Sequence, residues 1–410
     1  MTTARARAHL ERLCVASDGR HVGSAGNRAA ADYVAQTFVA LGLTMRSQAF
    51  DCLGWRHDGA HLMVDERSFD VQVSPYSLGC RVSGPLVALA TRDALAAADL
   101  SGAVALLHGD LAREPLTPKR FPFYQVPEHQ QIVALLEAKQ PLAVVALTDE
   151  DTATAGAVSP FPLIEDGDVD IPSVYLHARE GETLLALVGA TASLTIDAWR
   201  SPSSGRNVIA EVGDVAGARV VVMAHLDAKA GTPGALDNAT GVVTVLLLAE
   251  RSARSDPGVA VELVAVNGED HYDNPGEVTY LRGFASGLEP VSVCVNLDGL
   301  GFREGRTAYS LYGCTTAIEA AAASAFADAS RFVRGDPWYQ GDHMPFVMHG
   351  RPAIAVTSER MPTLLSTVIH TPADTLTLVD PGALVATADA LHALLVGLAS
   401  DCHGHIIRRP

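Results

Sequence analysis

The stretch Val220-Val221-Val222-Met223-Ala224-His225-Leu226-Asp227 joins an apolar run to a histidine and an aspartate. Such a run predicts a buried strand, and polar groups directly after a parallel strand lie where α/β proteins carry their sites. A further carboxylate follows in Ala235-Leu236-Asp237-Asn238. This part of the sequence therefore predicts an α/β fold with a polar site at the carboxyl end of a strand.

The same rhythm extends from about residue 202 onward. Apolar runs that fit strands alternate with segments whose apolar residues recur at helical spacing. This alternation predicts a three-layer αβα fold with a mostly parallel central sheet and helices on both faces. The expected strands are 219–224, 260–266, 291–297 and 352–357, and the expected helices are 238–253, 315–329 and 382–399.

The N-terminal half has a different pattern of predicted helices and strands. Residues 5–18 and 26–42 fit helices, and the glycine-rich segment 19–26 between them is expected to be a plain connector, with a phosphate-binding loop as the alternative. Short β-type runs separated by prolines then fill residues 51–201, where one helix is expected at 128–138.

This change from predicted helices to short β-type runs indicates an inserted domain. We expect residues 1–50 and 202–410 to form the catalytic domain and residues 51–201 to form an inserted, mostly β domain. The groups of potential ligand residues all lie outside the insert. The insert is therefore expected to shape or cover a site that belongs to the other domain.

The composition restricts the class of protein. The chain has 410 residues, of which 48% are hydrophobic, and a net charge of −17, so we expect a globular protein that does not bind nucleic acid or an anionic membrane. No uninterrupted apolar run reaches the roughly 18 residues of a membrane span. Residues 1–12 lack the apolar core of a secretory signal, so a cytoplasmic location is expected unless a signal has been removed. The six cysteines lie far apart, which favours reduced thiols.

Three more polar groups follow apolar segments. They are the acid pair Glu269-Asp270, the single acid Asp298, and His370. Each has a simpler interpretation taken alone, such as a solvated loop for the acid pair or a helix cap for Asp237. Together with His225 they form a set of imidazoles and carboxylates without thiolates, which suits zinc in a hydrolytic site, with manganese or cobalt as alternatives.

The spacing of these groups also suggests how they act. Asp227 lies two residues after His225, and a carboxylate commonly accepts the second ring N–H of a metal-bound imidazole. In an acid pair such as Glu269-Asp270, one carboxylate can bind metal while its neighbour moves a proton. The residues therefore point to metal-assisted hydrolysis.

These residues, with several longer strings, resemble the M28 family of zinc peptidases, in which two metals act together. The resemblance covers residues 202–410 and implies a zinc-aminopeptidase-like fold. The N-terminal helices also look like the family's opening, and residues 51–201 look more loosely like the protease-associated insert of many members. The strings that carry the match are Ala224-His225-Leu226-Asp227, Gly234-Ala235-Leu236-Asp237-Asn238-Ala239-Thr240-Gly241, Gly268-Glu269-Asp270, Asn296-Leu297-Asp298, Gly341-Asp342-His343-Met344-Pro345-Phe346 and His370-Thr371-Pro372-Ala373-Asp374-Thr375.

The resemblance implies two zinc ions per chain and a role for each residue. Glu269 would be the general base, and Asp227 would orient the ligand His225. Asp342 would lie beside the metal ligands without binding a metal ion itself. The implied ligands are His225 and Asp298 for one zinc ion, Asp270 and His370 for the other, and Asp237 as the bridge between them.

The chain departs from the family in three places. Relatives usually have two glutamates where this chain has Glu269-Asp270, and many have a tyrosine where it has Ile369. In those relatives the tyrosine can stabilise the oxyanion, so in this chain the donor must come from another residue. The candidates are His271, Tyr272, Tyr339 and His343. Third, the segment 271–277 replaces a short glycine-rich turn. It is expected near the substrate, with a solvated turn as the alternative.

The function implied is that of an aminopeptidase or dipeptidase. Such an enzyme would cleave the amide next to a free amino group in a small peptide or aminoacyl-amide, using water activated at a dinuclear zinc site. One alternative is a glutaminyl-cyclase-like acyltransferase with a single zinc on Asp237, Asp270 and His370. Another is a binding protein without catalysis on the same fold. The sequence leaves the substrate and the oligomeric state open.

Overall fold

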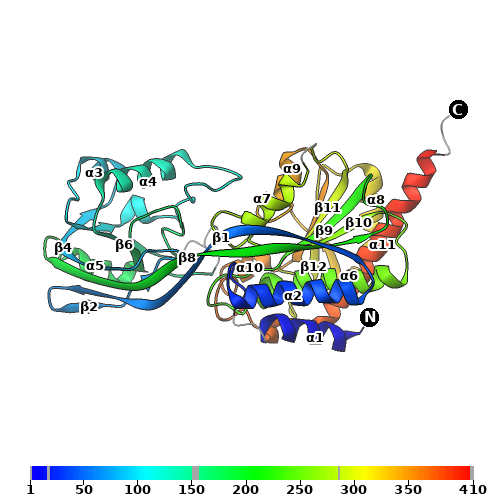
Figure 1. Ribbon diagram of the computed structural model, residues 1–410, viewed down its shortest axis with the longest axis horizontal. Coiled ribbons are helices and arrows are strands. Elements are labelled where there is room, and N and C mark those ends of the chain that lie inside the picture. Colours follow the sequence, from blue (N-terminus) through cyan, green and yellow to red (C-terminus); the bar gives the residue numbers. More distant parts are fainter. Residues whose placement is uncertain (1, 16–18, 150–156, 285–286, 407–410) are drawn as a thin grey trace. The chain divides into compact units, whose positions relative to one another are not determined.

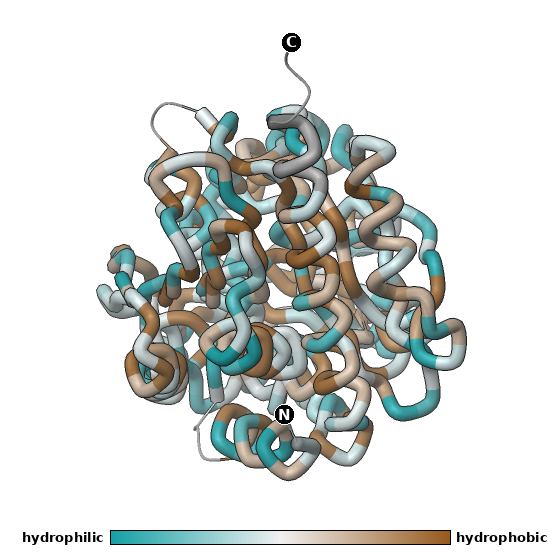
Figure 2. The backbone as a smooth tube through the Cα atoms, turned by 90° about the vertical axis from the view of Figure 1, so that its right-hand side faces the viewer, coloured by the Kyte–Doolittle hydropathy of each residue, from teal (hydrophilic) through white to brown (hydrophobic). Residues whose placement is uncertain are grey.

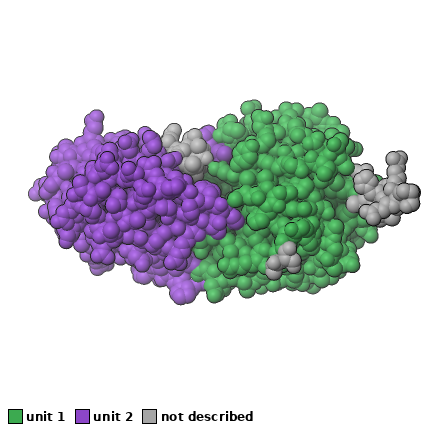
Figure 3. Space-filling view, turned by 90° about the horizontal axis from the view of Figure 1, so that it is seen from above, with its two compact units in different colours: residues 1–52, 204–364, 368–410 green, residues 53–203, 365–367 purple. Residues whose placement is uncertain are grey.

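The protein is described from a computed structural model, which describes residues 2–15, 19–149, 157–284 and 287–406, without the side chains of the last six. The chain forms two compact units, coloured separately in Figure 3. Unit 1 comprises residues 1–52, 204–364 and 368–410, and unit 2 comprises residues 53–203 and 365–367. The catalytic and protease-associated roles expected for these parts stay predictions.

Unit 1 is built on a mixed sheet in which β9 lies between two parallel neighbours. β9 pairs in parallel with β10 and with β11, and β11 pairs in parallel with β14. β9 and β10 are almost entirely buried, as expected for strands covered on both faces. In sheet order the strands are β13 (Phe332–Arg334), β12 (Thr307–Tyr312), β14 (Ala353–Ser358), β11 (Val291–Leu297), β9 (Arg219–His225), β10 (Val261–Val266) and the end of β8 (Thr191–Val212).

Helices cover both faces of this sheet, which confirms the three-layer prediction (Figure 1). On one face, α6 packs against β9 and α11. On the other, Tyr280 of α7 and Phe346 of α9 pack against the apolar side chains of the strands. The first layer contains α1 (Thr3–Cys14), α2 (Ala25–Ala40), α6 (Thr240–Arg254), α8 (Thr316–Ala325) and α11 (Pro381–Ile406), and the second contains α7 (Pro275–Arg282) and α9 (Met344–Met348).

The C-terminal helix α11 carries few hydrophilic residues, as the tube below the C label in Figure 2 shows. Its stretch Pro381–Ser400 is long and apolar enough to cross a membrane by length and composition, although no uninterrupted apolar run predicted this. Half of this stretch is buried in the structure, and α11 packs against α1, α6 and α8. These contacts account for its apolar side chains as the packing of a core helix.

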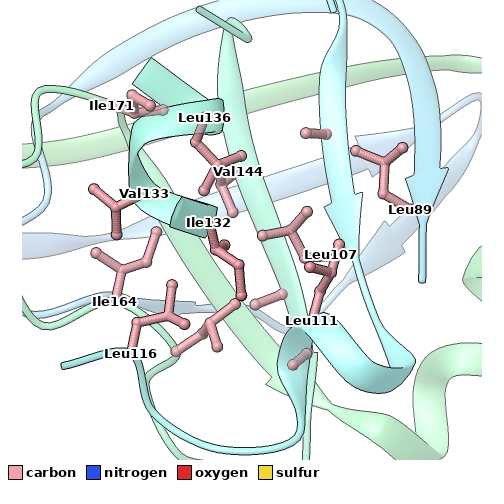
Figure 4. Packing of buried hydrophobic residues seen from close by; sticks show 14 of the residues in the cluster. Leu89, Leu107, Leu111, Leu116, Ile132, Val133, Leu136, Val144, Ile164 and Ile171 are labelled. Carbon is pink, nitrogen blue, oxygen red and sulfur yellow. The ribbon is translucent and has the colours of Figure 1, made fainter. Parts of the chain in front are cut away.

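Unit 2 has its own sheet, with parallel strands in the middle. β4, β5, β6 and β7 pair in parallel in that order, β3 adds an antiparallel edge beside β7, and β8, which also pairs with β1, lies antiparallel to β4. One face of this sheet packs against Ile132, Val133 and Leu136 of α4 (Figure 4). The elements are β1 (Thr44–Val64), β2 (Arg67–Phe69), β3 (Gln72–Val73), β4 (Cys80–Leu89), α3 (Arg92–Ala97), β5 (Val104–Leu107), α4 (Pro127–Lys139), β6 (Ala143–Thr148), β7 (Ser173–His177) and α5 (Gly181–Leu185).

Candidate metal centre

The centre lies where three neighbouring strands of unit 1 end. His225 is the last residue of β9, and Asp298 directly follows the adjacent strand β11. The pair Glu269-Asp270 follows β10 on the other side of β9 after a short turn. Because these strands are parallel, their carboxyl ends deliver all four side chains to one edge of the sheet.

A fourth carboxylate, that of Asp237, reaches this edge through the loop before α6. Asp237 leads through a cis peptide bond to Asn238, which donates from Nδ2 to the Leu297 carbonyl at 2.8 Å. The backbone passes so close to Leu297 that a Cβ on Gly241 would lie 2.4 Å from its carbonyl oxygen, so only glycine fits there. This anchoring fixes Asp237 next to the end of β11.

Asp237 lies between two histidines, with one oxygen toward each. Its Oδ1 is 3.0 Å from His225 Nε2, and its Oδ2 is 3.1 Å from His370 Nε2. Asp298 Oδ1 lies 3.6 Å from His225 Nε2, and Asp270 Oδ1 lies 3.2 Å from His370 Nε2. The structure therefore brings all five expected ligand residues together as two groups that share Asp237.

Each group has the geometry to hold a metal ion. Nitrogen and oxygen atoms of His225, Asp237 and Asp298 lie within 4.8 Å of one another, and so do those of Asp237, Asp270 and His370. Among the described residues, Nε2 of His225, which faces Asp237 and Asp298, and Oδ2 of Asp270 are buried without a hydrogen bond of normal geometry. Orphaned buried donors and acceptors are costly, so these atoms fit coordination to a cation.

The charge of the cluster also calls for cations. With Asp227 and Glu269 it holds five carboxyl groups and two imidazoles, so three negative charges would remain even if both rings were protonated. Burial raises the pKa of Glu269 well above its usual value, and the neighbouring acids outweigh the opposing effect of His225. Although burial favours the neutral ring, Asp270 and Asp237 raise the pKa of His370 to about 10. Both shifts express an excess of buried negative charge.

Asp227 supports two parts of the centre at once. Its carboxylate lies 3.6 Å from Nδ1 of His225 and accepts backbone N–H groups from Gly268 at 2.7 Å and Asp270 at 3.0 Å. Burial alone would raise its pKa, but His225 and the backbone donors lower it, so Asp227 is held as a carboxylate. The expected neighbour of His225 therefore also shapes the turn that carries Glu269.

Two supporting residues were not assigned from the sequence. The buried carboxylate of Asp374 accepts the N–H groups of Leu236 at 2.7 Å and Asp237 at 3.0 Å. The buried guanidinium of Arg20 donates to the carbonyls of Leu226 at 3.0 Å and Gly234 at 2.7 Å. Asp374 belonged to a matching string, whereas Arg20 lay in the segment interpreted as a plain connector.

His370 occupies an unusual backbone conformation. Its φ is +64°, in the left-handed region that side chains other than glycine rarely adopt. Such a conformation costs of order 1–2 kcal/mol and is concentrated at functional sites, where the surroundings impose it. Beside it, Ile369 is buried, with its N–H donated to the Leu364 carbonyl at 3.0 Å.

The segment after the acid pair is not a solvated turn, so that alternative is wrong. His271, Tyr272 and Asn274 are buried, and the chain enters α7 at Pro275. His271 Nδ1 lies 2.6 Å from an oxygen of Asp273, and the rings of His271 and Tyr272 are 4.6 Å apart. The segment is therefore a packed part of unit 1.

The other expected substrate residues have diverse surroundings. His343 is buried between the rings of Tyr312 and Trp338, and its Nε2 lies 3.1 Å from the Trp338 carbonyl. Tyr339 is 71% exposed, whereas Asp342 is fully buried. The contacts of His343 are those of a packing residue, and a substrate role for these side chains stays a prediction.

Comparison with known proteins gives the same picture. Residues 207–395 match the model of peptidase family M28. The probable lipoprotein aminopeptidase LpqL of Mycobacterium tuberculosis is 26% identical over 309 residues, which are 72% of this chain and 58% of that relative. The chain thus spans less than two thirds of the relative's length.

Solved structures share the fold. The aminopeptidase from Aneurinibacillus sp. strain AM-1 has a TM-score of 0.73 at 21% identity, with 96% of this chain and 93% of that chain covered. BSAP, a zinc aminopeptidase from Bacillus subtilis, has a TM-score of 0.71 at 20% identity, with 96% and 94% covered. Residues 207–395 of this chain thus match peptidase family M28, and the chain shares its fold with solved aminopeptidases.

Proposed function

We propose that the protein is a two-zinc hydrolase that cleaves the amide bond next to a free amino group, as an aminopeptidase or dipeptidase does. The observation that carries this proposal is the placement of Asp237 between His225 and His370, with one carboxylate oxygen toward each ring. A carboxylate in this position is suited to bridge two cations. Two divalent ions would also nearly balance the five carboxyl groups of the centre.

The donor set suits zinc and divides into two sites. His225, Asp237 and Asp298 would hold one ion, and Asp237, Asp270 and His370 would hold the other. Zinc, when bound, supplies a Lewis acid that polarises the scissile carbonyl and lowers the pKa of water toward 7. Imidazole nitrogen and carboxylate oxygen are common zinc ligands in catalytic sites, and neither group contains a thiolate.

Glu269 is the residue that we propose as the proton carrier. It follows Gly268 in a turn that Asp227 holds by backbone hydrogen bonds, next to the ligand Asp270. The carboxylate would accept a proton from the attacking water and deliver it to the leaving amine. Its raised pKa is consistent with a group that holds a proton between these two steps.

The surplus of acids also favours an amine as the group recognised. A protonated α-amino group of the substrate would find carboxylates on several sides of the centre, whereas a substrate carboxylate there would be repelled. Recognition of an amino group supports cleavage at a free N-terminus. The substrate class proposed is therefore a short peptide or an aminoacyl-amide.

A single-zinc acyltransferase is the competing proposal. It would need Asp237, Asp270 and His370 only, and would leave His225 and Asp298 without a cation. The buried Nε2 of His225, which faces Asp237 and Asp298 without a hydrogen bond of normal geometry among the described residues, supports the proposal of two ions. The cytoplasmic location expected from the sequence is retained as part of the proposal.

Metal analysis and kinetics together test this function. The purified protein should bind two zinc ions per chain and hydrolyse a member of a panel of dipeptides and aminoacyl-amides. Glu269→Gln should keep both ions and lose activity by about 100-fold or more, since general bases contribute on that scale. One tightly bound zinc in fully active protein would refute the dinuclear site, and wild-type turnover by the variant would refute the assigned base.

A further inference from the structure

Two buried acids, Glu277 and Asp342, meet next to the turn that carries Glu269. Glu277 lies in the first turn of α7 and is 4% exposed, and Asp342 precedes α9 and is 1% exposed. Their carboxyl groups lie within hydrogen-bonding reach of each other. Neither belongs to the two groups of metal ligands, so the proposed mechanism leaves this pair unexplained.

Further acids lie among the groups that act most strongly on this pair. His225, which lies in the centre, lowers the pKa of both acids, whereas Asp227 raises the pKa of Glu277 and Glu269 raises the pKa of Asp342. Burial, followed by the charges of Asp342 and Glu277, raises the pKa of the Cys294 thiol. Among the described residues, no donor reaches either oxygen of Asp342. Two buried carboxylates without donors between them repel each other, so one of them must carry a proton.

The pKa shifts of both acids agree with this geometry. Burial raises the pKa of Glu277, although its hydrogen bonds to Asp342 and Asn274 oppose the shift. Burial, followed by the charge of Glu277, raises the pKa of Asp342 well above its usual value. The proton therefore resides mainly on Asp342, which can donate it to Glu277.

Asn274 connects the pair to the proposed base. Its Nδ2 group donates to Glu277 Oε2 at 2.9 Å and to the backbone carbonyl of Glu269 at 3.1 Å. Asn274 is buried and has a φ of +44°, so its backbone is held in a conformation that needs support from its surroundings. Glu277 fixes the amide of Asn274, and this amide fixes the carbonyl of Glu269.

We propose that Glu277 and Asp342 share one proton and act as a positioning pair, which holds the backbone of Glu269 through Asn274. The inference rests on the proposed function, because it assigns the pair a role through the general base. The pair does not touch the substrate. It keeps the catalytic carboxylate in place, and a displacement of about 1 Å in such a group can cost about 100-fold in rate.

Kinetics with matched variants test the positioning role. Glu277→Leu removes the acceptor of Asn274 and should lower kcat by about 10-fold to 100-fold at unchanged KM and unchanged zinc content. Glu277→Gln keeps an acceptor for Asn274 and can donate to Asp342, so it should restore most of kcat. Glu250→Leu is the control, since Glu250 is equally buried but pairs with Arg5 and His9 on α1. A wild-type kcat in Glu277→Leu would overturn the positioning role.

The pH profile separates positioning from mere stability. At high pH the shared proton of the wild type should leave, and kcat should fall as the two carboxylates repel each other. The amide of Glu277→Gln cannot lose its proton in this way, so the basic limb of its profile should move to higher pH. Superimposable profiles would overturn the shared proton.

Two further measurements do not need activity. In zinc-loaded protein at neutral pH, the infrared band of a protonated carboxyl group should be present in the wild type and lost in Asp342→Asn. Hydrogen exchange of residues 268–274 should be faster in Glu277→Leu but not in Glu277→Gln. An unchanged band or unchanged exchange refutes the pair even if no substrate is found, whereas inactivity of the wild type refutes only the proposed function.

Discussion

The carboxylate of Asp227 accepts the backbone N–H of Gly268 at 2.7 Å, and this contact joins the ends of two neighbouring strands. The same carboxylate faces the ring of His225 at the end of β9 and receives the N–H of Asp270 after β10. One side chain thus sets the orientation of a ligand from one strand and the path of the turn from the other. Loss of its charge should disturb both proposed zinc sites.

Asp227→Asn should weaken zinc binding and stability together. The amide keeps one acceptor oxygen but presents a donor where backbone N–H groups now point, so buried donors lose their partner. Supporting carboxylates of this kind are worth about 10-fold to 100-fold in metal affinity, and breaking a buried charged network costs about 3–5 kcal/mol. Zinc titration against a competing chelator and urea unfolding measure the two effects.

The exposed Glu304→Gln serves as the control for this variant, because it removes one negative charge from an exposed side chain. Its zinc affinity and unfolding free energy should match those of the wild type. Equal zinc affinity in Asp227→Asn and Glu304→Gln would contradict the role given to Asp227.

Asp270→Ala should remove one zinc ion and leave the other. Asp270 faces His370 at 3.2 Å and belongs to only one of the two proposed sites, whereas Asp237 belongs to both. The stoichiometry should therefore fall from two ions to one in Asp270→Ala, and both sites should weaken in Asp237→Ala. Metal analysis after gel filtration distinguishes these outcomes, and loss of both ions in Asp270→Ala would speak against independent sites.

Asp270→Glu, which installs the residue usual in relatives, should not improve binding in this chain. The backbone N–H of Asp270 is fixed to Asp227, and its carboxylate already reaches His370. An added methylene in a packed site costs about 1–3 kcal/mol. Isothermal titration should therefore show weaker binding of the second zinc ion. Tighter binding would mean that the aspartate of this chain binds this ion less well than a glutamate in the same position.

Removal of metal should destabilise unit 1. The five carboxyl groups of the centre repel each other without cations, and any ligand that binds only the folded state stabilises it by about 2.7 kcal/mol at 100 times its dissociation constant. Chelation should lower the thermal midpoint, and zinc should restore it with two equivalents per chain. Calorimetry of the chelated and reloaded protein measures this, and an unchanged midpoint would contradict a metal site at this place.

Local sequence patterns predicted the frame of the site well. β9, β10, β11 and β14 begin and end within one residue of the expected segments, because a strand buried on both faces needs an unbroken apolar run. β12, Thr307–Tyr312, was not expected, since it carries a serine and a threonine within its buried run. The helix α7 was missed because Asn274-Pro275-Gly276 is typical of a turn, whereas here Pro275 opens a helix.

The support of the site could not be predicted in the same way. Asp374 binds the N–H of Leu236 across 138 positions of sequence, and Arg20 binds the carbonyl of Gly234 across 214 positions. Such contacts depend on how helices, strands and loops that are distant in sequence pack together, and no local sequence pattern predicts them. Three of the expected ligands, His225, Asp270 and Asp298, were predictable because each lies at or just after the end of a strand whose place in the sheet the pattern already implied. Asp237, before α6, and His370, after α10 (Met361–Leu365), do not follow strands in this way.

The buried ring of His343 should make the folded protein less stable in acid. Burial lowers the pKa of His343 from 6.5 to about 4, against the opposing contact with the Trp338 carbonyl. In the unfolded chain the ring binds a proton near pH 6.5, so between that pH and pH 4 the unfolded state holds more protons than the folded state. Stability should therefore rise with pH across this window and be lost as the pH falls, by up to about 3 kcal/mol from this group. Urea unfolding at both ends of the window should show a smaller difference for His343→Gln than for the wild type. The exposed His349→Gln is the control, and it should keep the wild-type difference. An equal pH dependence in all three proteins would show that the ring of His343 stays accessible to protons in the folded state.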